Sequence, residues 1–170
     1  PKDIVDKLSV ELRKMVELDD VKKRIHAEGG DPLTSTPAEY AADIAELEAA
    51  RTRAYHATDA MPLPGEAFAR LSPDLLSNLR LKLHPSITLL RSRFPVVSVW
   101  EASQTNMDVG VWKEEAALIA RPHLEVEVWR LPPGGYEFFS ALVEGKAIGS
   151  AIEGAIAVAA DFDLAASFRI

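Results

Sequence analysis

A chain of 170 residues has room for one ordinary domain or two small ones. Its 48% apolar and 26% charged residues are typical of a soluble globular protein, and no apolar run approaches the ~20 residues that a bilayer span needs. The absence of cysteine excludes a disulfide framework and a thiolate nucleophile. The net charge of −7 opposes attraction to DNA, so a nucleic-acid partner is disfavoured. The opening PKDIVDKL has neither the charged nor the apolar region of an export signal, which leads us to expect a cytoplasmic protein.

Residues 1–57 carry the periodicity of α-helices. Apolar side chains recur at intervals of three and four residues and predict one amphipathic helix: Ile4, Val5, Leu8, Leu12, Met15 and Val16. A second, short helix is expected to end at Gly29 and Gly30, because glycine readily adopts the left-handed conformation that closes helices. A third helix begins at TSTPAEY, where Thr36 and Glu39 have the spacing of a capping box, and continues to about His56.

The pattern changes after a proline-containing stretch, residues 58–64, which we interpret as a linker. Short helical turns are expected in EAFARL, residues 66–71, and in DLLSN, residues 74–78. In LRLKLH, residues 79–84, leucines alternate with basic residues, which predicts a strand with one buried and one basic face. FPVVSVWE, residues 94–101, is rich in β-branched residues and predicts a second strand.

The C-terminal part of the chain predicts a hairpin and then helices. AALIAR and LEVEVWRL read as two strands joined at Pro122 and His123. Three short helices are expected after them, separated by Gly145 and by Asp161, which is an expected N-cap.

The order of these elements predicts an α+β fold. N-terminal helices are followed by a small, mostly antiparallel sheet and a C-terminal three-helix part that resembles a winged helix. The expected domains are a helical segment, residues 1–57, and a β-rich plus helical domain, residues 58–170.

The first 44 residues resemble one known family. PKDIVDKL, LDDVKKRI and GGDPLTSTPAEY, in that order, are similar to the C-terminal end of the Bug-type solute-binding receptors of tripartite tricarboxylate transporters. Those receptors hold a carboxylate ligand in a cleft between two lobes. Because this stretch corresponds only to the closing part of such a receptor, the resemblance does not carry ligand capture with it.

From about Ala42 to the end, the chain resembles a second family, the bacterial HvfC-like accessory proteins, which are labelled as having a DNA-binding domain. The likeness rests on ADIAELEAARTRAYHATDAMPL, LRLKLHPSITLLRSRFPVVSVWEA and LPPGGYEFFSALVEGKAIGSAIEGA, and HPS and PVVSVWEA are its most specific phrases. Family partners work with multinuclear iron enzymes that modify precursor peptides. The resemblance therefore implies a protein that presents a peptide or activates such an enzyme, with no iron site of its own. Together the two resemblances describe a fusion, with its seam near STPAEYAADIAELEAA.

The main candidate binding surface is a basic strip with one aromatic neighbour: Arg80, Lys82, His84, Arg91, Arg93 and Trp100. Long basic side chains ordinarily occupy solvated faces, so the strip is either such a face or a docking surface for an acidic peptide or partner protein. In the second case a sheet edge would add an extended peptide strand by backbone pairing. Trp100 is either core or part of this surface.

No residue set has the spacing of a catalytic or metal centre, so we expect no enzyme, no metal and no cofactor. The histidines are irregularly spaced, no base is paired in sequence with Ser86 or Ser98, and only His84 and Glu101 stay open as a coordinating pair.

Three functions follow as hypotheses. The first is a noncatalytic peptide- and protein-binding accessory module that presents a precursor peptide to a multinuclear iron peptide-modifying enzyme. The alternatives are a DNA-binding transcriptional regulator and a remnant of a carboxylate solute-binding receptor. The exposed apolar face expected on the first helix also suggests a homodimer.

Overall fold

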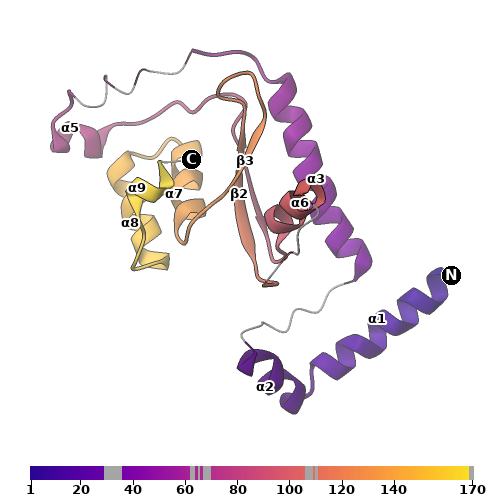
Figure 1. Ribbon diagram of the computed structural model, residues 1–170. Coiled ribbons are helices and arrows are strands. Elements are labelled where there is room, and N and C mark those ends of the chain that lie inside the picture. The colour runs from indigo at the N-terminus through magenta and orange to yellow at the C-terminus, as the bar shows by residue number, and fades with distance from the viewer. Residues whose placement is uncertain are drawn as a thin grey trace. The chain divides into compact units, whose positions relative to one another are not determined.

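The computed structural model describes residues 1–28, 36–61, 64, 66, 70–105, 109 and 111–168, drawn as ribbons in Figure 1. The helices are α1 (Lys2–Val16), α2 (Asp19–Ala27), α3 (Pro37–His56), α5 (Pro73–Asn78), α6 (Val96–Thr105), α7 (Gly135–Val143), α8 (Ile148–Val158) and α9 (Leu164–Ser167). The strands are β1 (Thr88–Ser92), β2 (Glu115–Ala120) and β3 (Glu127–Arg130), in the order β1-β2-β3. The predicted α+β class is confirmed. Within these ranges no helix is both long and apolar enough to cross a bilayer.

The chain forms two compact units. The first unit consists of Pro1–Glu48 and Ser92–Glu115, and the second unit of Ala49–Arg91 and Ala116–Ile170. The division between them falls inside α3 and at the ends of β1 and β2. The domain boundary expected near residue 57 stays a prediction.

The N-terminal helices of the first unit begin and end close to the predicted positions. Thr36 and Glu39 form the expected capping box, in which the Thr36 amide donates to Oε2 of Glu39 at 2.7 Å and the Glu39 amide donates to Oγ1 of Thr36 at 3.1 Å. The Thr36 amide, together with the Thr36 hydroxyl at 3.1 Å, donates to Oε2 of Glu39 and holds the pKa of this carboxyl below its usual value of 4.5. The predicted closure at Gly29 and Gly30 lies outside the described residues.

The apolar face of α1 is exposed rather than packed. No residue of α1 is buried, and side chains along the predicted stripe keep about half of their surface in contact with solvent: Ile4 52%, Leu8 57%, Leu12 55% and Met15 48%. A helix of this length is only marginally stable without a packed face. The stripe is therefore available to a partner.

The predicted second strand, residues 94–101, is wrong, because the structure places the helix α6 there. Val96 and Val97 are fully buried in its first turn. Oε2 of the buried Glu115 accepts from the amides of Val97 at 2.9 Å and Ser98 at 3.0 Å, and Oε1 accepts from the Ser98 hydroxyl. A carboxylate distant in the sequence thus satisfies amide groups that the first turn of a helix leaves without partners.

The hairpin and three C-terminal helices of the second unit are confirmed. β2 and β3 pair antiparallel, with Leu118 opposite Trp129. Gly145 separates α7 from α8 with a φ of 75°, in the left-handed region that favours glycine. The cap of α9 is Asp163, whose carboxylate accepts from the Ala166 amide at 3.0 Å, so the N-cap predicted at Asp161 is wrong by two residues. The likeness of this part to a winged helix stays a prediction.

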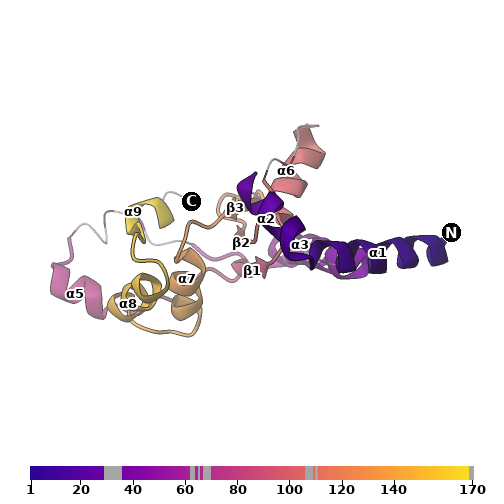
Figure 2. The same ribbon diagram turned by 90° about the horizontal axis from the view of Figure 1, so that it is seen from below.

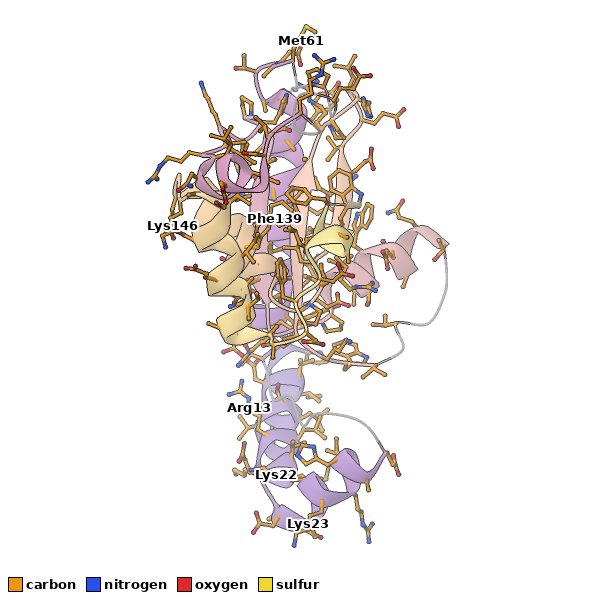
Figure 3. All side chains as sticks on the ribbon, turned by 90° about the vertical axis from the view of Figure 1, so that its left-hand side faces the viewer. Arg13, Lys22, Lys23, Met61, Phe139 and Lys146 are labelled. Carbon is orange, nitrogen blue, oxygen red and sulfur yellow. The ribbon has the colours of Figure 1, made fainter. Side chains whose placement is uncertain are left out.

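The core of the second unit lies between β2 and the C-terminal helices. α7 packs along α8, as Figure 2 shows. Phe138 is fully buried, and Phe139, labelled in Figure 3, points from α7 into the interior of the unit. Gly134 begins α7 with a φ of 76°, and a side chain there would place its Cβ 2.9 Å from the Phe162 ring. Half of the residues in which turns were predicted, 67–69 of 66–71, lie outside the described residues, whereas DLLSN is part of α5.

Candidate functional site

Residues 79–84 do not form the predicted strand. Apart from one antiparallel bridge between Arg80 and Ala147, the segment has neither helix nor strand, and Figure 1 shows it as a long connection between α5 and β1. The Ile148 amide donates to the Leu79 carbonyl at 2.9 Å, which fixes this end of the segment against the start of α8. The sequence pattern failed because a strand needs a neighbouring strand, and the described chain provides only one bridge.

The segment nevertheless has the side-chain arrangement of a strand. Leu79, Leu81 and Leu83 are half-buried against the core cluster of the second unit, while Arg80 and Lys82 are exposed. This alternation is that of an extended chain with one face on a core. The predicted inward leucines and outward cations are therefore found, without the ladder of hydrogen bonds that normally accompanies them.

One edge of this extended segment has unpaired backbone groups. The Leu79 carbonyl accepts on the side of Ala147, whereas the Leu79 amide donates to the Leu76 carbonyl at the end of α5. In an extended chain successive residues direct their N–H and C=O groups to opposite sides. The groups of Arg80 and Lys82 therefore point to the other side. Within the part of the chain that the structure describes, their N–H and C=O groups make no hydrogen bond. Exposed groups of this kind can accept an added strand.

The two cations on this edge form no ion pair with a carboxylate of the described residues. Nη1 of Arg80 donates to the Gly145 carbonyl, a neutral acceptor. Lys82 makes no ion pair or side-chain hydrogen bond to any residue that the structure describes. The second unit thus presents two positive charges two residues apart on one face of an extended chain.

His84 is held in a local hydrogen-bond network instead of extending into solvent. Its Nδ1 lies 2.8 Å from the Ser86 hydroxyl and accepts from the Ser86 amide at 3.2 Å, and its Nε2 lies 3.2 Å from the Ala60 carbonyl. These partners fit the tautomer with its proton on Nε2. A base beside Ser86 was not expected from the sequence, and His84 occupies that place. The Ser86 hydroxyl also accepts from the Arg121 amide at 2.9 Å, and the residue is only 1% exposed. The hydrogen bonds between His84 and Ser86 therefore stabilise the turn of residues 84–87.

Arg91 and Arg93 each face a carboxylate. In the second unit, Nη2 of Arg91 pairs with Oε1 of Glu137, and its guanidinium lies 4.3 Å from the centre of the Tyr136 ring. In the first unit, Nη2 of Arg93 lies 3.0 Å from Oε2 of Glu39, the capping-box carboxylate. Both charges are thus offset within their own unit.

Trp100 belongs to α6 of the first unit and is half-buried there. Arg93 and Trp100 lie in a different unit from Arg80, Lys82 and His84, so the structure brings together only part of the predicted strip. His84 and Glu101 are divided between the two units in the same way. Among the described residues no group of three or more His, Asp or Glu side chains is placed to hold a metal ion.

Sequence reasoning missed Arg121. Its guanidinium is 9% exposed and donates from Nε to the Ala54 carbonyl at 3.1 Å, and from Nη2 to the Ala57 carbonyl at 2.7 Å and to Asp59 at 2.6 Å. These carbonyls lie in the last turn of α3 and directly after its end, where a helix offers few amide donors of its own. An arginine that ends an apolar strand and precedes Pro122 was the only local signal.

A pocket of about 210 Å³ adjoins the C-terminal end of the extended segment. Its apolar walls come from β1 and its approach, β2, β3, α7 and the residue after α9: Ile87, Leu118, Ala120, Pro122, Trp129, Phe139 and Phe168. Its polar members are His84, Ser86 and Ser167. The hydroxyl of Ser167 donates to the Asp163 carbonyl at 3.0 Å, so each polar member already has a partner.

The chain matches no protein-family model, no curated protein and no solved structure.

Proposed function

We propose that the second unit is a noncatalytic module that binds an acidic peptide in an extended conformation. The observation that carries this proposal is the unpaired edge formed by Arg80 and Lys82. A peptide strand laid along this edge would hydrogen-bond to both residues and complete the strand that the alternating leucines and cations predict. Peptide binding would thus occur at a segment with strand geometry whose outer edge has no strand partner among the described residues.

The charges on this edge favour acidic residues in the peptide. Side chains of neighbouring strands lie beside each other on the same face, so peptide residues opposite Arg80 and Lys82 would share their outward face. Carboxylates there gain a favourable interaction with both cations, whereas basic residues are repelled. Because Arg91 and Arg93 are already offset by Glu137 and Glu39, the proposal assigns them no contact with the peptide.

The resemblance to HvfC-like proteins suggests where such a peptide goes. In that family the accessory protein works with an iron enzyme that modifies a precursor peptide. We propose the same partnership here, in which this module presents the precursor and the enzyme supplies the metal chemistry. The alternatives have less support. The helices α8 and α9 contain no Lys or Arg for DNA phosphates, and Arg80 and Lys82 lie on an exposed edge rather than in a cleft that encloses a carboxylate ligand.

Reversing one cation should weaken peptide binding. For a peptide of alternating glutamate and threonine, we expect Lys82→Glu to raise the dissociation constant about tenfold, because an attractive exposed pair becomes repulsive. Fluorescence anisotropy of the labelled peptide measures this, and higher salt should weaken wild-type binding. Lys113→Glu makes the same change in charge at an exposed residue of the first unit and should have little effect. Equal affinity of Lys82→Glu and wild type would contradict the proposed site.

A second experiment tests whether the peptide pairs with the protein through backbone hydrogen bonds. Methylating alternate peptide amides removes the donors that face the protein in one isomer and those that face solvent in the other. The first isomer should lose binding and the second should keep it. Two isomers that bind alike would exclude an added strand.

We also propose that α1 is the contact surface of a homodimer. Its apolar stripe is about half exposed, and the helix carries four basic and three acidic side chains, so two copies meet with little net repulsion. Leu8→Glu with Leu12→Glu should abolish a concentration-dependent dimer in sedimentation equilibrium, while Lys7→Glu, off the stripe, should retain it. A wild-type chain that stays monomeric at high concentration would refute this contact.

A further inference from the structure

A peptide bound along the unpaired edge of Arg80 and Lys82 would have a second face, which these two cations do not contact. In an extended peptide, alternate side chains point to opposite faces, so residues between the acidic ones share the face of Leu79, Leu81 and Leu83. That face packs against the core cluster that includes Leu118 and Phe139. Both residues also line the 210 Å³ pocket, and His84 belongs to the pocket and ends the extended segment. The pocket therefore begins where the extended segment ends, and its walls belong to the same core cluster as the one that the inward leucines pack against.

The chemistry of the pocket selects an apolar occupant. The deep walls, Leu118, Ala120 and Phe139, are each at most 7% exposed, whereas Phe168 at the rim is 53% exposed. The hydroxyls and ring nitrogens in the wall are already hydrogen-bonded within the protein. A polar occupant would lose its hydration without gaining a partner, and a charged one would lose more.

The size of the pocket fits one ring. A dry apolar cavity of about 150 Å³ holds benzene, so 210 Å³ accommodates a phenyl group and little more. Aromatic walls also offer edge-to-face contacts with a bound ring.

We infer that the pocket binds one aromatic side chain of the acidic peptide, and that this residue lies an odd number of positions from the acidic residues that face Arg80 and Lys82. This inference rests on the proposed function. It makes the recognised sequence an alternation of acidic residues on one face with an aromatic anchor on the other, rather than acidic character alone.

A peptide series tests the anchor. Each peptide carries two glutamates separated by one threonine, in a threonine background, and a single phenylalanine placed one, two or three positions before or after them. At least one odd-spaced peptide should bind about tenfold or more tighter than the phenylalanine-free peptide, since burial of a phenyl group favours binding by that order. Peptides with even spacing should gain less than about threefold, because their ring lies on the solvent face.

Substitutions in the pocket wall test whether the phenylalanine of the peptide binds in the pocket. Ala120→Leu fills the pocket and should abolish the gain from phenylalanine, and Phe168→Ala, which removes an exposed rim residue, should reduce it. Val143→Leu, at an exposed position of α7 that does not line the pocket, should leave the gain intact. Peptides that bind equally with and without phenylalanine, or an equal gain in affinity for even and odd spacings, would contradict the aromatic anchor. Either result would leave the proposed peptide binding along the edge unaffected. If no peptide in the series binds, the proposed function fails.

Discussion

Arg121→Met is expected to lower the free energy of unfolding by about 3 kcal/mol. Methionine keeps much of the apolar stem but removes the donors to the Ala54 and Ala57 carbonyls, which lie at the end of α3. The Ala57 carbonyl loses its guanidinium donor at a cost of about 1–3 kcal/mol, and the Ala54 carbonyl, which still accepts from the Ala57 amide at 3.3 Å, loses one hydrogen bond worth about 0.5–1.5 kcal/mol. The pair with Asp59 adds little, because that carboxylate is 77% exposed.

Urea denaturation followed by circular dichroism measures this change, provided that the m-value is unchanged. Arg91→Met is the matched control, since it removes a guanidinium that is 47% exposed and should cost less than about 1 kcal/mol. A loss of less than about 1 kcal/mol for Arg121→Met would show that water replaces the guanidinium and that Arg121 is not the cap of α3.

Glu115→Ala should cost a comparable amount, about 3 kcal/mol, in the first unit. The substitution leaves the Val97 and Ser98 amides and the Ser98 hydroxyl without the carboxylate that now accepts from them, at a position that is 5% exposed. The neighbouring Glu114 is exposed, so Glu114→Ala should change the free energy of unfolding by less than about 0.5 kcal/mol.

Glu115→Ala should also unfold α6, in addition to lowering the free energy of unfolding. Helical content should fall in Glu115→Ala at temperatures where wild type is fully folded, because the first turn of α6 loses its acceptor. Retained helicity together with unchanged stability would mean that α6 is held by the burial of Val96 and Val97 alone.

Local patterns were sufficient for most helices and for the hairpin. The capping box at Thr36 and Glu39, the glycine at 145 and the hairpin turn after Arg121 each act over a few neighbouring residues, and the structure shows them where the sequence predicts them. The helix α6 was mispredicted because Val96, Val97 and Val99 favour a strand locally, while burial and the distant Glu115 stabilise a helix.

The candidate site was predictable in composition and not in detail. Alternation in residues 79–84 correctly indicated which side chains face the core, yet it could not show that the segment pairs only at Arg80. Nor could it show that Arg91 faces Glu137 or that His84 is enclosed by a turn, because both depend on tertiary neighbours. Arg121 was missed for the same reason, since its partners are more than 60 residues away.

Amide hydrogen exchange at residues 79–84 tests the central claim most directly. In the protein alone, the amides of Arg80 and Lys82 should exchange rapidly, because no described group accepts from them. With a saturating acidic peptide, these two amides should become protected while that of Leu83, which points to the opposite side, changes less. Protection of Arg80 and Lys82 already in the protein alone, or no change with bound peptide, would contradict the account.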